Sequence, residues 1–439
     1  MELVKIVRDS GIVGAGGAGF PSHVKFSAKA EYVILNGAEC EPLLRVDQQL
    51  IEIFADEIIT GLEYIVEATE AKKAFIGIKG KHKQAIDLLR EKLKNNNLIE
   101  LFVLGDFYPA GDEQVLVNEV TKRVVPEASI PLKVGCIVTN VETVLNVARA
   151  VNGKPVTHTY LTIAGKVPKP LTLRLPIGVS VREVLKLSGL SNFENIKVID
   201  GGPMMGKILK SIDSPITKTT KGLIVLSEDD YLIRRKGMTT KMALHQSKAG
   251  CLQCRMCTDL CPRYLLGHNI QPHLMMRKSN YDKAEDIKGS EMASLCCECA
   301  VCEIYACPVG LSPRLININY KQKMAEEGIK YKPSKETFIA LKTREYRKIP
   351  VQRLISRLGL KEYDVAAPLV EIDFKATIVN IPLKMHVGAP SSPIVQVGQS
   401  VSEGELIAEI PENSLGARVH ASISGKVTKI DNCITIESI

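Results

Sequence analysis

The chain of 439 residues contains no tryptophan, and aromatic residues make up only 5% of it. Single-stranded nucleic acids are commonly bound by stacking on aromatic side chains, and no nucleic-acid module is recognisable. No run approaches the ~20 apolar residues of a membrane-spanning helix. The first residues, MELVKIVRDSG, do not follow the basic-then-apolar plan of a signal peptide. We therefore expect a cytoplasmic protein without a transmembrane segment and without a nucleic-acid partner.

Positive charge is concentrated in one part of the chain. The formal net charge is +8, and residues 330–361 hold ten Lys or Arg against two acidic residues, Glu336 and Glu345. Such a run most often forms a solvated helix face, although it could also dock an acidic protein, a membrane surface or a nucleic acid. Charge alone leaves these interpretations open.

The cysteines are distributed very unevenly. Nine of the twelve lie between Cys251 and Cys307. The first block reads C-x₂-C-x₂-C-x₃-C-P, the spacing of bacterial ferredoxins, and the second differs only in having four residues before its last cysteine. Structural zinc would use separated C-x₂-C pairs, and a disulfide framework belongs in a small secreted domain. Two runs of four predict iron–sulfur clusters.

The spacing also predicts which cysteines share a cluster. In two-cluster ferredoxins the last cysteine of each run, which precedes a proline, binds the cluster of the other run. Cys297 is then left over and is interpreted as a packing residue. Cys136 and Cys433 stand in apolar, strand-like segments and are expected to be small buried hydrophobic residues. The predicted ligands are Cys251, Cys254, Cys257 and Cys307 for the first [4Fe–4S] cluster, and Cys296, Cys299, Cys302 and Cys261 for the second.

A glycine-rich segment lies near the amino terminus. Residues 11–21 read GIVGAGGAGFP, with five glycines in nine residues, and Lys25 follows. Glycines let a loop adopt positive φ and bring its N–H groups against a phosphate or a flavin ring. The segment predicts a cofactor loop without naming the cofactor. Residues 3–9 are not a convincing strand of the kind that precedes a Rossmann loop.

Four ordered segments of the first 150 residues resemble the FMN and NADH site of the NADH-oxidising flavoprotein subunit of complex I. They are GAGGAGFP with Lys25, NGAECEP at 36–42, YPAGDE at 108–113 and TNVET at 139–143. The resemblance implies an α/β domain that holds FMN with its glycine loop, its lysine and polar groups of the other three segments. The implied FMN residues are Gly14, Gly16, Gly17, Lys25, Asn36, Gly111, Asp112, Thr139 and Asn140.

The same resemblance implies an NADH site beside the flavin. Its residues would be Phe20, whose ring can stack, together with Glu41 and Glu113. Two positions depart from complex I, where an arginine stands in place of Ala15 and a Gly-Glu-Glu triplet in place of residues 111–113. We expect these two departures to change the affinity for NADH more than the affinity for FMN.

The rest of the chain resembles further domains of such proteins. Residues 157–190 read as short strands and a helix and resemble the soluble-ligand-binding β-grasp (SLBB) domain, while GGPMMG at 201–206 is interpreted as a turn with packing methionines. A helix at 241–248 is expected to carry the cluster insert. Residues 381–439 have turns every ~8–12 residues and resemble a biotinyl or lipoyl-type barrel-sandwich. Its expected tip at 409–414 has no lysine, which excludes a swinging arm.

This order of domains resembles the superfamily that contains the RnfC proteins of Rnf-type ferredoxin:NAD oxidoreductases and the PduS-type cobalamin reductases. The barrel lies at the carboxyl end, as in PduS-type proteins, whereas RnfC proteins have it at the amino end. The expected fold class is α/β multidomain. The expected domains are an FMN/NADH-binding domain at 1–152, an SLBB domain at 153–230, a helical domain with two ferredoxin motifs at 231–330, a basic linker at 331–370 and a barrel-sandwich domain like that of RnfC at 371–439.

The resemblance implies an NADH-dependent oxidoreductase. Electrons would pass from NADH to FMN, then to the two [4Fe–4S] clusters, and finally to cobalamin or a partner reductase, with no side chain needed as a catalytic acid or base. The alternative is an electron-input or relay subunit without its own NADH site, in a proline reductase, methylenetetrahydrofolate reductase or Rnf-type complex. Both imply a hetero-complex, in the cytoplasm, within a bacterial microcompartment or peripheral to a larger complex. The sequence does not identify the terminal acceptor.

Overall fold

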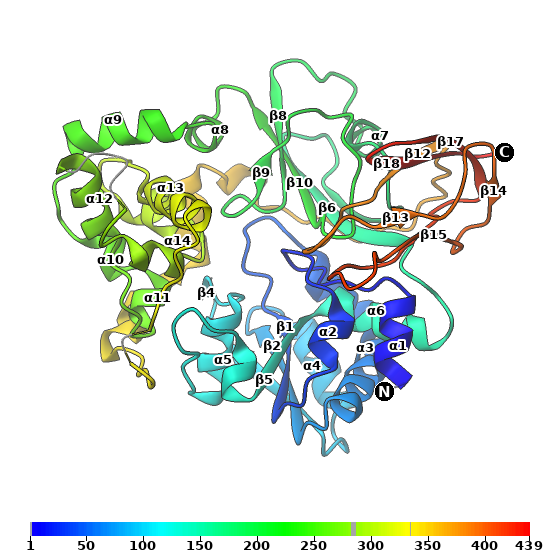
Figure 1. The fold of residues 1–439 in the computed structure, drawn as a ribbon, viewed down its shortest axis with the longest axis horizontal. Coiled ribbons are helices and arrows are strands. Elements are labelled where there is room, and N and C mark those ends of the chain that lie inside the picture. The colour runs from blue at the N-terminus through cyan, green and yellow to red at the C-terminus, as the bar shows by residue number, and fades with distance from the viewer. Residues whose placement is uncertain (1, 282–286, 334) are drawn as a thin grey trace.

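The computed structural model describes residues 2–281, 287–333 and 335–439. Figure 1 shows a parallel-sheet lobe that contains the amino terminus, a second sheet above it, a helical lobe on the left and a β module with the carboxyl terminus on the right. Among the described residues, no helix has the length and apolar character needed to cross a membrane.

The amino-terminal lobe is built on a parallel sheet with the strand order β3-β2-β1-β5. Its strands are largely buried and lie among helices, as expected of a parallel sheet. Asn140 ends β5, and its partner in the register is Asn36, the residue before the last of β1, so both lie at the carboxyl edge of the sheet. The strands are β1 (Tyr32–Gly37), β2 (Lys73–Lys79), β3 (Ile99–Leu104) and β5 (Cys136–Asn140), and the helices are α3 (Val46–Ala68), α4 (Lys83–Lys92), α5 (Glu113–Thr121) and α6 (Val141–Val151), with η1 (Pro131–Val134) before β5.

The glycine-rich segment is a loop between two helices, α1 (Glu2–Asp9) and α2 (Ser22–Phe26). A helix and not a strand precedes it, so it is not a Rossmann loop. A β-bridge between Val13 and Pro21 closes the loop, and Gly14 N donates to Phe20 O at 2.9 Å. The loop tip at 16–18 is exposed.

A five-stranded mixed sheet follows, with the order β7-β6-β10-β8-β9. Its first elements are two strands and a helix, the order that the sequence predicts for 157–190. Leu161 and Ile163 of β6 belong to the same hydrophobic core as Val144 of α6, so the two sheets are packed as one body. The elements are β6 (His158–Gly165), β7 (Leu171–Pro176), α7 (Val181–Leu187), β8 (Ile196–Asp200), β9 (Lys207–Ile208) and β10 (Gly222–Ser227).

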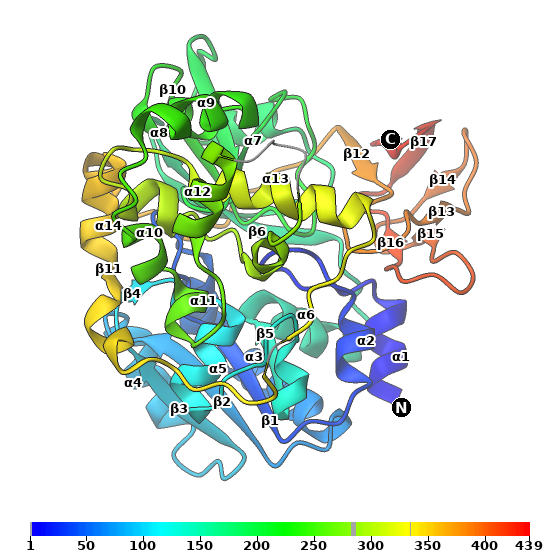
Figure 2. The same ribbon diagram turned by 60° about the vertical axis from the view of Figure 1, so that its left-hand side comes forward.

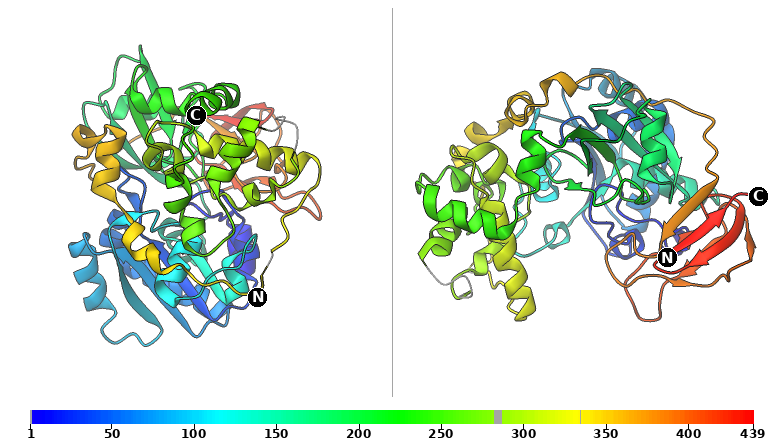
Figure 3. Two further views of the ribbon diagram at one scale, coloured as in Figure 1. Left: turned by 90° about the vertical axis from the view of Figure 1, so that its left-hand side faces the viewer. Right: turned by 90° about the horizontal axis from the view of Figure 1, so that it is seen from above.

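The cysteine runs lie in a helical lobe that stands to one side of the two sheets (Figure 3). The helix expected at 241–248 is confirmed as α9 (Thr240–Gly250), which begins where the Thr239 side chain accepts a hydrogen bond from Met242 N. Met275, Met276, Ile316 and Tyr320 form the core of the lobe. The other elements are α8 (Tyr231–Lys236), α10 (Met256–Asp259), α11 (Pro262–Leu265), α12 (Pro272–Tyr281), η2 (Glu291–Leu295), the π-helical η3 (Val301–Ala306) and α13 (Pro313–Glu326).

The basic stretch forms a strap that runs from α13 along the parallel-sheet lobe (Figure 2). Arg344 and Lys348 pair with Glu119 of α5 at 2.6 and 2.9 Å, and Arg347 pairs with Asp259 at 3.3 Å. The interpretation as a solvated helix face is therefore wrong at 342–348, and these three charges are satisfied within the chain. The strap contains η4 (Lys342–Arg347), β11 (Ile349–Pro350), which pairs with β4 (Phe107–Tyr108), α14 (Val351–Leu358) and η5 (Lys361–Tyr363).

The carboxyl-terminal β module has two small sheets and packs on the glycine loop. Val387 N donates to Gly19 O at 3.1 Å. Cys433 is half-buried, less than expected, whereas Cys136 is fully buried. The sheets have the orders β12-β18-β17-β14 and β13-β15-β16. Their strands are β12 (Ile378–Pro382), β13 (Ser392–Pro393), β14 (Ser400–Val401), β15 (Leu406–Glu409), β16 (Val419–His420), β17 (Gly425–Ile430) and β18 (Cys433–Glu437).

Candidate flavin and cluster site

The four segments that resemble a flavin site meet at the carboxyl edge of the parallel sheet. Asn36 Nδ2 donates to Gly111 O at 2.8 Å, which joins the second segment to the third. A Cβ on Gly16 would lie 3.1–3.2 Å from side-chain atoms of Asn140, so a larger residue would crowd the contact between the first segment and the fourth. Open α/β sheets bind their ligands beyond this edge.

Lys25 stands beside the end of β5. Its Nζ donates to Val138 O at 2.9 Å. Burial lowers the pKa of Lys25, and the carboxylate of Glu113, which is exposed, opposes that shift. An ammonium group has three N–H donors. Lys25 therefore keeps donors for an anion at the edge of the sheet.

The tip of the glycine loop suits a cofactor with a phosphate and a flat ring. A Cβ on Gly17 would meet no atom within 4 Å. Within the part of the chain that the structure describes, the N–H groups of Gly16 and Gly17 donate no hydrogen bond. Together with Lys25 they offer donors to a phosphate, and Thr139 and Asn140 border the same space. These residues fit FMN.

Asp112 faces the helical lobe. Its Oδ1 accepts hydrogen bonds from the N–H groups of Gln114 and Val115, both at 3.1 Å, and so caps α5. The guanidinium of Arg263 donates to both carboxylate oxygens of Asp112, at 2.6 and 2.9 Å. Arg263 follows Cys261 by two residues. Both oxygens of the Asp112 carboxylate are thus bound by groups of the chain itself. The pair with Arg263 connects the third flavin segment to the end of a cysteine run.

Glu41 is also engaged within the chain. It accepts hydrogen bonds from the N–H groups of Met204 and Met205, each at 2.8 Å. Burial raises the pKa of Glu41, and these two bonds and the Lys236 ammonium oppose the shift. The GGPMMG turn has a structural role, because its backbone holds this carboxylate. Of the residues implied for NADH, Phe20 is half-buried where the glycine loop closes, and Glu113 is exposed beside Lys25.

A buried ionic cluster lies next to Asn140. It joins Glu39 and Glu142 of the flavin segments to Asp47 and Lys221, which no motif in the sequence indicated. Asn140 Nδ2 donates to both oxygens of Asp47 at 3.1 Å, and Lys221 pairs with Glu142. Burial and the Asp47 carboxylate raise the pKa of Glu39 to about 8, while burial raises that of Asp47 to about 6. Burial lowers the pKa of Lys221 to about 7. Several ionisable groups thus share one enclosed space beside the flavin edge.

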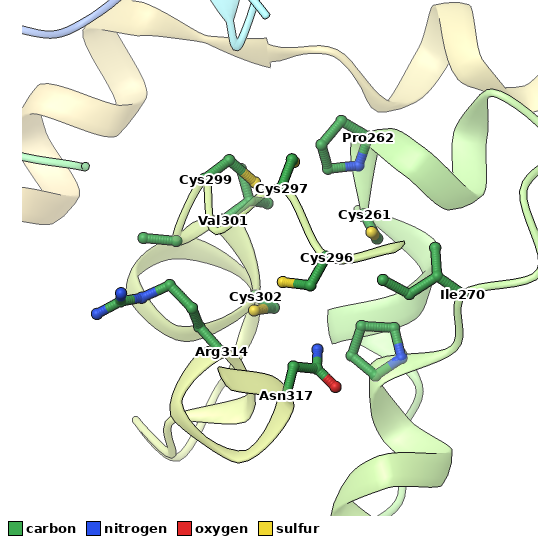
Figure 4. A pocket seen from close by; sticks show the side chains of 12 residues that line it. Cys261, Pro262, Ile270, Cys296, Cys297, Cys299, Val301, Cys302, Arg314 and Asn317 are labelled. Carbon is green, nitrogen blue, oxygen red and sulfur yellow. The ribbon is translucent and has the colours of Figure 1, made fainter. Parts of the chain in front are cut away.

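The cysteines line two pockets in the helical lobe. We call the first the inner pocket and the second the outer pocket. Figure 4 shows the inner pocket, with Cys261 on the side of α11, Cys296 and Cys302 on the segment that leads through η3, and Arg314 nearby. The predicted ligands in the inner pocket are Cys261, Cys296, Cys299 and Cys302, and those in the outer pocket are Cys251, Cys254, Cys257 and Cys307.

The donor chemistry of both pockets fits iron–sulfur clusters. Burial raises the pKa of Cys257 and Cys296 to about 12, so their thiolates need a positive partner such as iron. The described residues contain no group of three or more His, Cys, Asp or Glu placed to hold a single metal ion. A [4Fe–4S] cluster does not need such a group, because each thiolate binds a different iron atom. Cys297 also lines the inner pocket, beside Cys299.

Tyr108 connects the flavin segments to the inner pocket. It is buried, and its hydroxyl donates to Cys299 O at 2.9 Å. Tyr108 is the first residue of the third flavin segment, and Asp112 of the same segment binds Arg263. The sequence showed that Tyr108 belongs to a motif, but it did not indicate either partner.

Family models match three parts of the chain. Residues 7–149 match the Nuo51 FMN-binding domain, residues 250–312 match a 4Fe-4S dicluster domain, and residues 356–438 match the RnfC barrel sandwich hybrid domain. The chain is therefore a flavoprotein with iron–sulfur clusters, and its cofactors are FMN and [4Fe–4S] clusters. The barrel match begins before residue 371, where the sequence had placed the start of that domain.

The chain is also similar to curated proteins over nearly its whole length. It is 44% identical over 434 residues to the cobalamin reductase PduS of Citrobacter freundii, covering 98% of this chain and 95% of the relative. The PduS protein of Salmonella typhimurium is 44% identical over 437 residues, covering 99% and 96%. One component of the Na⁺-translocating ferredoxin:NAD⁺ oxidoreductase complex of Acetobacterium woodii is 35% identical over 289 residues, covering 64% and 62%.

Proposed function

The chain belongs to the family of the PduS cobalamin reductases, and from this membership we propose that it oxidises NADH and delivers electrons to cobalamin or to a partner reductase. It is an oxidoreductase with FMN and [4Fe–4S] cofactors. One observation carries the proposal: Tyr108 and Asp112 of a single flavin segment bind the two cysteine runs directly, through Cys299 and Arg263.

FMN, when bound, accepts two electrons from NADH and passes them singly to iron–sulfur clusters. The chain supplies binding and orientation. The N–H groups of the glycine loop would lie against the FMN, and the Lys25 ammonium, Asn36 and Asn140 would bind its phosphate and ribityl chain. Phe20 and Glu113 would contact the nicotinamide side of NADH. No side chain of the site has to move a proton as an acid or base.

The cysteine ligands are proposed as the sequence assigns them. Cys261 reaches the pocket of the second run, as the proline-linked cysteine of a two-cluster ferredoxin does, and Cys307 reaches that of the first. Cys297 is proposed to pack beside the cluster without binding iron. The mixed sheet is proposed to be an SLBB β-grasp domain, and the chain to work in the cytoplasm within a hetero-complex.

A relay subunit without an NADH site is the second candidate. Its support is that Glu41 is held by Met204 and Met205 and that Asp112 is held by Arg263. Two carboxylates of the flavin and NADH segments therefore already have partners. Such a subunit would take electrons from a reduced ferredoxin.

The two candidates differ in a cobalamin assay. Anaerobically reconstituted protein is mixed with aquacobalamin, and the corrin spectrum is followed after addition of NADH or of a reduced ferredoxin. We expect NADH to suffice for reduction of the cobalt. Reduction with ferredoxin but not with NADH would support the relay subunit instead.

A further inference from the structure

The two cysteine pockets differ in their surroundings. Segments on several sides cover the inner pocket, since Tyr108 binds the carbonyl of Cys299 and residues of α14 share a hydrophobic core with Val301 and Ile304 of η3. Cys261, Cys299 and Cys302 are each only 8% exposed. This pocket is attached to the flavin lobe and has little surface to offer a partner.

The outer pocket reaches solvent at Cys254, which is exposed, whereas Cys257 and Cys307 of the same pocket are 9% and 8% exposed. Residues 252–256, which carry Cys254 between α9 and α10, are all exposed. Leu252 and Val309 line the pocket and are 70% and 49% exposed, and Met256, between the lining residues Arg255 and Cys257, is 44% exposed. Single exposed apolar residues are ordinary, but a group of them beside one site marks an interaction surface. Figure 1 places α9 and α10 on the side of the helical lobe that faces away from the parallel sheet.

The same surface is positively charged. The chain has no Asp or Glu between Asp230 and Asp259. Lys241, His245 and Lys248 recur at helical spacing on α9, and all three are exposed, whereas Ala243 and Ser247 on the opposite face are buried. Arg255 is exposed at the pocket itself and pairs with Asp259 at 3.7 Å, so the unopposed charges of this surface are those of α9. None of the described residues that line the outer pocket is acidic.

The two pockets are close to each other. Cys257 of the outer pocket lies on α10, and α10 packs against η3, the helix that carries Cys302 of the inner pocket. Electrons that reach the inner pocket from the flavin side can therefore pass to the outer pocket, which a partner protein can approach from solvent. An apolar centre with a charged rim is the composition of protein interfaces in which charge guides encounter.

We propose that electrons leave this protein at the outer pocket, and that the surface formed by Leu252, Met256, Val309, Lys241, Lys248 and Arg255 docks an acidic electron-transfer protein. We call this surface the exit surface. The inference rests on the proposed function and adds the place and the chemistry of the acceptor. Each transfer oxidises one cluster by one electron and reduces the partner's cofactor by one.

The test uses an oxidised flavodoxin, which is acidic, as the probe and cytochrome c, which is basic, as the reference acceptor. The reconstituted protein is reduced with dithionite, freed of excess reductant and mixed with either acceptor in a stopped-flow instrument. Because dithionite supplies the electrons, the result does not depend on whether NADH is the natural donor. Failure of the NADH reaction would therefore be distinguishable from failure of the exit surface.

The decisive variant is Lys241→Glu with Lys248→Glu. We expect about tenfold slower reduction of flavodoxin at low salt and a weaker dependence on salt, because the lost attraction acts on encounter. Reduction of cytochrome c should not slow. A matched control, Lys384→Glu with Lys426→Glu, makes the same charge change on exposed residues of the β module and should leave both rates as they are.

Two further measurements keep the result interpretable. The EPR signals of both clusters should be unchanged in the α9 variant, and Leu252→Gln should weaken flavodoxin binding without changing its salt dependence. Equal slowing by the α9 variant and the control, or no slowing by either, would overturn the proposal. Binding of the wild-type protein to anionic vesicles but not to flavodoxin would also overturn it, in favour of a membrane surface.

Discussion

Arg263 donates from both terminal nitrogens to the two carboxylate oxygens of Asp112, at 2.6 and 2.9 Å. The two side chains are 9% and 14% exposed. Arg263 directly follows the first cysteine run, and Asp112 belongs to the third flavin segment. A bidentate pair fixes orientation as well as distance, so this pair helps to set how the helical lobe sits against the flavin site.

Replacing Arg263 with Met should lower the free energy of unfolding by about 3–5 kcal/mol, because it leaves a buried carboxylate without its partner. Urea denaturation of the holoprotein measures this change. The double variant Arg263→Met with Asp112→Asn should recover part of the loss, since Asn carries no charge and still caps α5. A double variant as unstable as the single one would mean that the pair itself is not the cause.

Replacing Lys25 with Ala should release FMN and leave the iron content unchanged. The reason is that Lys25 is the ammonium beside the glycine loop and the end of β5, whereas the cysteines lie in the helical lobe. Flavin fluorescence after ultrafiltration and an iron assay measure the two contents. Lys29→Ala is the matched control, since Lys29 is exposed and pairs with Glu70 at the surface. Full FMN affinity in Lys25→Ala would show that the phosphate lies elsewhere.

Replacing Cys261 with Ala should damage the cluster of the inner pocket and spare that of the outer pocket. Cys254→Ala should do the reverse, and Cys297→Ala should leave both clusters in place. EPR of the dithionite-reduced variants and iron analysis measure each outcome. A spectrum of Cys297→Ala with only one cluster would contradict the ligand assignment and make Cys297 a ligand.

Glu39 should contribute stability at pH 5 that is lost as the pH rises to about 7. The pKa of Glu39 is raised from 4.5 to about 8 in the folded chain, so in this range the folded chain holds a proton that the unfolded chain has released. Lys221, whose pKa is lowered from 10.5 to about 7, acts in the opposite direction, and only above pH 7. His82, His158 and His420, whose pKa values burial lowers to about 4, 3 and 3, act in the opposite direction over part of this range, so the contribution of Glu39 is measured as a difference between two proteins. The Tm of Glu39→Gln should rise relative to that of the wild-type protein between pH 5 and 7, and a constant difference in Tm would exclude this contribution of Glu39.

The sequence predicted the parts of the site whose residues lie close together along the chain. Cysteine ligands two or three residues apart and glycines within one loop give a pattern that is visible without a structure. The helix α9 was predicted for the same reason, because its periodicity is local. The carboxyl-terminal β module followed from its regular turns.

The sequence did not indicate contacts between residues that are far apart along the chain. Asp112 and Arg263 are 151 residues apart, and Tyr108 and Cys299 are 191 apart. The basic strap was misinterpreted because its charge was visible, whereas its partners Glu119 and Asp259 lie on α5 and α10. Resemblance implied Glu41 as an NADH residue, but its bonds to the 201–206 turn depend on how the two sheets pack.

Stopped-flow mixing of NADH with the anaerobically reconstituted protein tests the central claim most directly. We predict that the flavin absorbance bleaches first and that the iron–sulfur absorbance decreases afterwards, with EPR signals from both clusters in samples frozen at the end of the reaction. Bleaching by dithionite but not by NADH would contradict the claim that this chain oxidises NADH.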